Sequence, residues 1–137
     1  MWWIYALLSA VFAALTAIFA KIGIANVNSN LATAIRTIII LLIAWGIVLA
    51  RGEQKGLSTI SNRNLIFLAI SGVATGLSWI FYFKALEIGK VSQVAPVDKL
   101  SVAIALILSV IFLHETINIK TAIGAAFIIA GTLVMIW

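Results

Sequence analysis

Two ionisable side chains, Asp98 and Lys99, are adjacent within a long apolar stretch of the chain. Counted at about 1.5 Å per residue along a helix, they lie about 10 to 12 Å inside that stretch. A charge this deep in a membrane costs about 2.5–3.5 kcal/mol near the centre on insertion scales, so the residues that carry one usually face protein or water. Asp98 and Lys99 are therefore the first candidates for a substrate or proton site.

Neighbouring residues on a helix point about 100° apart, so we expect Asp98 and Lys99 to find separate partners rather than to face each other. Arg36, Lys84 and Lys21, each in another apolar stretch, are candidate partners for Asp98. All three are also close enough to a helix end to extend to the membrane interface. If they face the protein instead, the surplus of cations over anions favours a ligand with a carboxylate.

Two aromatic residues and the only proline lie at a similar depth. Trp79 and Tyr82 either pack inside the bundle or line a pocket for a flat or amphipathic ligand. Pro96 either kinks a helix from within or begins a shorter helix, and in both cases it is a candidate hinge beside the charges. The predicted substrate-binding residues are Arg36, Trp79, Tyr82, Asp98 and Lys99.

Five apolar runs must position these side chains, at residues 2–24, 31–50, 65–86, 91–112 and 119–137. Each has about 19 to 23 residues, enough for a helix to cross a hydrocarbon core of about 30 Å. Charged residues make up only 9% of the chain, whereas a soluble domain carries about 25%. The runs are continuous rather than alternating, which excludes a β-barrel. The sequence predicts an all-α polytopic membrane protein, a bundle of five transmembrane helices forming one domain over residues 1–137 in the cytoplasmic (inner) membrane.

Catalytic and metal-binding patterns do not stand out in the sequence. The chain has no cysteine, which removes thiol catalysis and cysteine-ligated metals. His114 and Glu115 at a helix end form neither an HExxH motif nor a nucleophile–base pair. We therefore expect no enzymatic activity, no cofactor and no metal. The net charge of +5 comes from basic residues scattered near helix ends, which suits lipid headgroups better than nucleic acid.

The distribution of basic residues sets the orientation only weakly. With the N-terminus in the cytoplasm, the inner connections hold Arg51, Lys55, Arg63 and Lys120, and the outer ends hold Lys84 and Lys90, with Lys21 just inside the first run. Basic residues favour the cytoplasmic side. Two interpretations remain open, one fixed orientation with a weak signal and insertion in both orientations.

Several segments together resemble the EamA domain of the drug/metabolite transporter superfamily. Residues 94–137 carry a proline-containing start, an apolar run to Phe112, the helix end at residues 113–115, and a last helix with Gly124 and Gly131. Residues 78–89 are similar to the third helix of that domain, and Lys21 occupies a position where many members have a basic residue. The chain departs from the family at His114, where glycine is commoner, which leaves the geometry of that turn open.

The resemblance implies transport of a small polar or amphiphilic metabolite. Most members carry two such domains in inverted orientation around a central cavity, and this chain carries one. We therefore predict a secondary transporter that works by alternating access as an antiparallel homodimer. One alternative is an auxiliary half-subunit of a heteromeric transporter or lipid-linked-sugar flippase, paired with a similar five-span partner. Another is a non-transporting scaffold held by small-residue stripes such as Gly72 and Gly76.

Overall fold

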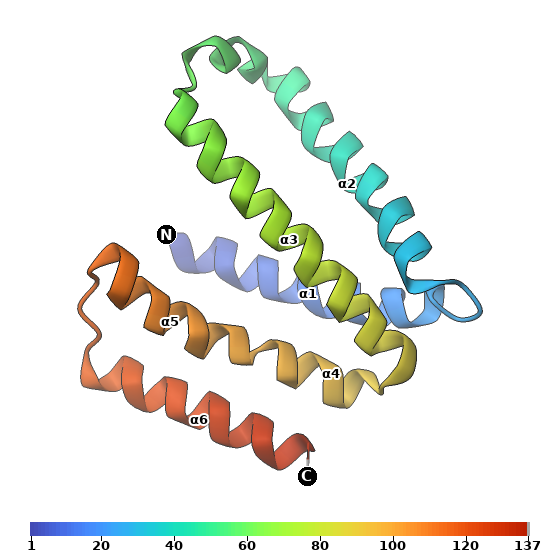
Figure 1. Cartoon of the computed structure of the whole chain (residues 1–137), viewed down its shortest axis with the longest axis vertical. Coiled ribbons are helices and arrows are strands. Elements are labelled where there is room, and N and C mark those ends of the chain that lie inside the picture. Colours follow the sequence, from blue (N-terminus) through green and yellow to red (C-terminus); the bar gives the residue numbers. More distant parts are fainter. Residues whose placement is uncertain (137) are drawn as a thin grey trace. The chain divides into compact units, whose positions relative to one another are not determined.

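The chain folds into long helices joined by short connections, as the apolar runs predict (Figure 1). The computed structural model describes residues 1–136, so Trp137, the last residue of the fifth predicted run, lies outside the described residues. In chain order the elements are α1 (Trp2–Gly23), α2 (Ser29–Arg51), the 3-10 helix η1 (Glu53–Thr59), α3 (Asn62–Ile88), α4 (Val91–Asp98), α5 (Leu100–Leu113) and α6 (Ile119–Ile136). Within residues 1–136, five segments are long and apolar enough to cross a membrane. The predicted all-α, five-span class is confirmed.

The fourth span is divided between two helices. α4 ends at Asp98, Lys99 lies in the turn that follows, and α5 begins at Leu100. Pro96 lies inside α4 rather than at the start of a helix. A proline has no amide hydrogen and its ring crowds the preceding turn. The interruption lies three residues after the proline, where the amide of Lys99 bonds to the carbonyl of Pro96 at 3.0 Å, a three-residue spacing instead of four.

Two helix ends show why the boundaries fall where they do. The side-chain oxygen of Asn28 accepts hydrogen bonds from the amides of Asn30 (2.9 Å) and Leu31 (3.3 Å), so α2 starts before the apolar run does. α5 ends at His114, whose φ of 54° is the left-handed conformation that glycine adopts most easily. The histidine therefore keeps the geometry that a glycine would give at this position.

The chain divides into two compact units. One contains residues 1–19 and the chain from Ile88 onward. Within this unit α6 packs along both α4 and α5. The buried Thr132 of α6 places its hydroxyl group 3.3 Å from the carbonyl of Pro96 and 2.8 Å from that of Ile128. A polar contact between helices is thus made where the fourth span is interrupted.

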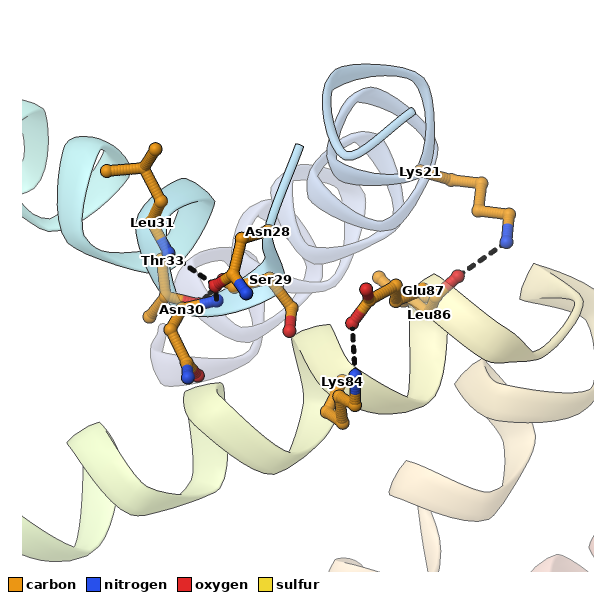
Figure 2. Close-up of polar contacts among 9 residues, drawn as sticks. All are labelled: Lys21, Asn28, Ser29, Asn30, Leu31, Thr33, Lys84, Leu86 and Glu87. Atoms are coloured by element: carbon orange, nitrogen blue, oxygen red, sulfur yellow. Dashed lines mark hydrogen bonds and ion pairs between the residues drawn. The ribbon is translucent and has the colours of Figure 1, made fainter. Parts of the chain in front are cut away.

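The other unit is Ala20–Glu87 and holds the last turn of α1, all of α2 and almost all of α3. Its buried residues gather near the end of α3 and the start of α2, and they are Ile24, Ser29, Thr33, Phe83 and Leu86. Lys21 donates a hydrogen bond to the carbonyl of Leu86, which connects the end of α1 to the end of α3 (Figure 2). Most other apolar side chains are exposed, as expected for helices that face lipid.

Candidate functional site

The guanidinium group of Arg36 lies over two aromatic rings of α3. Its central carbon is 4.7 Å from the ring centre of Trp79 and 4.9 Å from that of Phe83. Trp79 and Phe83 are four residues apart, so they share one face of α3 and present their rings together to α2. A cation over an aromatic face is stabilised by about 0.5–2 kcal/mol, more when it is shielded from water. The rings therefore hold the Arg36 charge within the span.

Tyr82 borders the same cluster. Its ring centre is 6.3 Å from that of Phe83, with the two planes at 67° in an edge-to-face arrangement. The structure thus brings together three of the five predicted substrate-binding residues, Arg36, Trp79 and Tyr82, all from the unit Ala20–Glu87.

Phe83, whose ring also contacts Arg36, is not among the residues predicted from the sequence. This side chain is only 2% exposed. The signal available in the sequence was its spacing of four residues from Trp79. In a run as uniformly apolar as α3, that spacing alone does not show which face of the helix is turned toward Arg36.

Asp98 and Lys99 form a second group, at the break between α4 and α5. The ammonium group of Lys99 lies 3.2 Å from a carboxylate oxygen of Asp98, and the two side chains are 55% and 37% exposed respectively. The prediction that these neighbours do not face each other is wrong, because Lys99 lies in a turn and its long side chain reaches back to Asp98. This pair belongs to the other compact unit, and its place in a common cavity with Arg36 stays a prediction.

The remaining cations of the spans have partners of their own. Lys84 forms an ion pair with Glu87 at 2.7 Å, one turn further along α3. Lys21 donates to the carbonyl of Leu86. The unit Ala20–Glu87 contains two carboxylates. Glu53 forms an ion pair with Arg51, and Glu87 forms one with Lys84. The cluster around Arg36 is built from aromatic rings rather than from a carboxylate of its own unit.

The whole chain, residues 1–137, matches the EamA-like transporter family. The protein belongs to this family. A relative from a Sinorhizobium species, described as an uncharacterized transporter in the cobO 3′ region, is 51% identical over 134 residues, which cover 98% of this chain and 95% of the relative. An uncharacterized protein of Methanocaldococcus jannaschii is 30% identical over 132 residues, which cover 96% of this chain and 93% of that protein. No solved structure matches the chain.

Membership of the EamA-like family confirms the resemblance drawn from the motifs and is consistent with the drug/metabolite transporter superfamily. Together with five apolar helices, it establishes a multi-pass membrane protein of a transporter family. Membership indicates transport rather than catalysis. The two relatives are covered almost end to end by this EamA-like chain, so they too are chains of similar length.

Proposed function

We propose that the chain is a secondary transporter of the cytoplasmic membrane that moves a small polar or amphiphilic metabolite bearing a carboxylate by alternating access. The observation that carries this proposal is the Arg36 guanidinium group over the rings of Trp79 and Phe83. Family membership supports transport as the general activity, and the chemistry of the cluster supports the choice of ligand.

A guanidinium group is planar and carries five N–H donors around its edge. An aromatic ring has no lone-pair acceptor for these N–H groups, so a ligand can still accept hydrogen bonds from them. A carboxylate matches two of these donors at once, which gives a strong and orientation-specific contact. Because the carboxylates of the same unit pair with Arg51 and Lys84, we expect the substrate to supply the anionic partner of Arg36. Trp79 and Tyr82 would then contact the apolar part of that substrate.

The break at Lys99 supplies a candidate moving part. α4 and α5 are interrupted at Lys99, three residues after Pro96, and discontinuous helices form ion and substrate sites in transporters. In the proposal, Lys99 adds a second attraction for the carboxylate. Asp98 orients Lys99 or carries a coupling proton.

The assembly in the proposal is an antiparallel homodimer. Two relatives have a length similar to that of this chain, which supports the view that single-domain proteins of this kind are not unusual. The weak bias of basic residues between the two sides of the membrane is compatible with insertion in both orientations. Two copies in opposite orientations would place two Arg36 clusters around one pathway.

The proposal is tested by uptake into vesicles that contain the purified chain. The probes are radiolabelled L-alanine, L-leucine and L-phenylalanine together with the corresponding amides, which lack the carboxylate. We expect uptake of one or more acids and about tenfold or more preference over the amide.

R36K keeps the charge and loses the planar fork, so we expect uptake to fall about tenfold or more.

Arg63 offers a matched control for the R36K substitution. It also lies over an aromatic ring, 5.9 Å from the centre of Phe67, but at the start of α3. R63K keeps the charge that influences orientation and is expected to transport like the wild type. Uptake of acids and amides at equal rates, or wild-type transport by correctly folded R36K, would rule out Arg36 as the carboxylate site.

A further inference from the structure

A polar cavity of about 430 Å³ lies in the unit Ala20–Glu87, away from the cluster around Arg36. Its walls come from the last turn of α1, the connection between α1 and α2, and the end of α3. Lys21, Asn26, Asn28 and Glu87 supply polar groups, and the buried Ile24 contributes an apolar surface. Its size is within the usual range of small-molecule sites, about 300–1,000 Å³.

The cavity wall contains both a cation and a carboxylate, and each is held in place. Lys21 is anchored through its hydrogen bond to the carbonyl of Leu86, near the end of α3. The carboxylate of Glu87 accepts a hydrogen bond from Lys84 at 2.7 Å, and the Ser29 side chain points toward it (Figure 2). A carboxylate has about four acceptor positions, so Glu87 can serve a ligand as well as its protein partners.

The connection between α1 and α2 fixes the rest of the wall. Asn26 has a φ of 61°, a left-handed conformation that asparagine tolerates better than most residues. Asn28 uses its side-chain oxygen to cap α2. These two residues give the turn a defined backbone shape, and both line the cavity together with Lys21 and Glu87.

The location and charges of the cavity indicate the chemistry of its ligand. α1 ends at Gly23, α2 begins at Ser29 and α3 ends at Ile88, so the cavity lies where the spans leave the hydrocarbon region and meet lipid headgroups. A cation and a carboxylate on one wall match a ligand that carries both charges. Neither observation depends on the transport proposal.

We propose that this cavity binds a zwitterion that combines a primary ammonium group with a phosphate or carboxylate. The ammonium group donates hydrogen bonds to Glu87, and the anionic group accepts them from Lys21 and the neighbouring amides. Two sources share this chemistry, the headgroup of phosphatidylethanolamine and a free solute such as an amino acid. Phosphatidylcholine and phosphocholine do not match, because their trimethylammonium group has no N–H to donate.

The first experiment compares two soluble probes, O-phosphoethanolamine and phosphocholine, by calorimetric titration of the purified, delipidated wild-type chain. Losing hydrogen bonds to a charged acceptor weakens binding about tenfold or more, so we expect phosphocholine to bind at least that much more weakly. This comparison requires no variant. Equal binding of the two probes, or binding of neither, would overturn the proposal.

Two substitutions then test the assigned roles. E87Q should lose most of the preference for O-phosphoethanolamine, and K21M should weaken the binding of both probes. E53Q is the matched control. Glu53 lies in η1, forms an exposed ion pair with Arg51 at 3.5 Å and does not line the cavity. Retention of the full preference in folded E87Q would also overturn the proposal.

The source of the ligand is decided with lipids. The wild-type chain is mixed with equal amounts of phosphatidylethanolamine and phosphatidylcholine in detergent, and bound lipid is measured by native mass spectrometry. Selective retention of phosphatidylethanolamine that is reversed by O-phosphoethanolamine would support a headgroup site. Binding of O-phosphoethanolamine without lipid selectivity would support a solute site of the same chemistry.

Discussion

Arg36 and the Asp98–Lys99 pair satisfy their charges in different ways. Arg36 lies over two rings, so its charge is stabilised without a neighbouring carboxylate of its own unit. Lys99 is paired with Asp98 at 3.2 Å. Charges within a membrane span are costly, so the residues that carry them usually face protein or water. The position of this pair beside a break in a transmembrane helix is therefore easier to explain by function than by folding.

Replacing Asp98 tests whether this carboxylate carries a coupling proton. D98N keeps the size of the side chain and removes its charge, so we expect an imposed inward proton gradient no longer to accelerate uptake. Exchange of substrate without a gradient should persist. The measurement is uptake with and without the gradient, with E115Q, at the turn between α5 and α6, as the control acid. Acceleration by the gradient in D98N equal to that of the wild type would exclude Asp98 as the proton carrier.

At the scale of the elements, the spans are predictable from sequence because long apolar runs have one solution in lipid, the helix. The helix caps and the break in the fourth span depend on which local hydrogen bonds form, and the hydropathy pattern does not predict these bonds. The cap of α2 is Asn28, three residues before the apolar run at residues 31–50 begins. The fourth span breaks after Asp98, which in turn allows Lys99 to reach it.

The candidate site was predictable to a similar degree. Depth in the spans selected Arg36, Trp79 and Tyr82, and the structure places them together. Depth does not reveal which side chain of a neighbouring helix faces the charge. Phe83 was therefore missed, although it lies as close to Arg36 as Trp79 does, at 4.9 and 4.7 Å.

The break in the fourth span gives a prediction at this scale. Proline in a helix interior costs about 3 kcal/mol relative to alanine, so P96A should join α4 to α5, raise the temperature of thermal unfolding and slow uptake. Hydrogen exchange of residues 95–101 should slow as well. V97A, at the exposed neighbouring position, is the control and should change none of these. A P96A variant that is less stable, or one that transports as fast as the wild type, would count against a hinge at Pro96.

For the whole molecule, the question is how a chain with five candidate spans forms a transport pathway. Five spans put the two ends of the chain on opposite sides of the membrane. The EamA-like relatives of similar length pose the same question. An antiparallel homodimer requires that one sequence insert in both orientations. An auxiliary half-subunit requires one orientation and a partner chain with the opposite one, so orientation separates the two.

Orientation is measured with single cysteines, which the cysteine-free chain allows. Ser58 lies in η1 and Gly89 directly follows α3, so the two positions are on opposite sides of the membrane in any one copy. We expect a membrane-impermeant maleimide to label S58C and G89C each from both sides. S58K and G89K add a basic residue on opposite sides and should bias insertion in opposite directions. Each variant alone should transport poorly, and the two reconstituted together should recover uptake. Labelling of each site from one side only would contradict the antiparallel homodimer and would favour a half-subunit that requires an oppositely oriented partner.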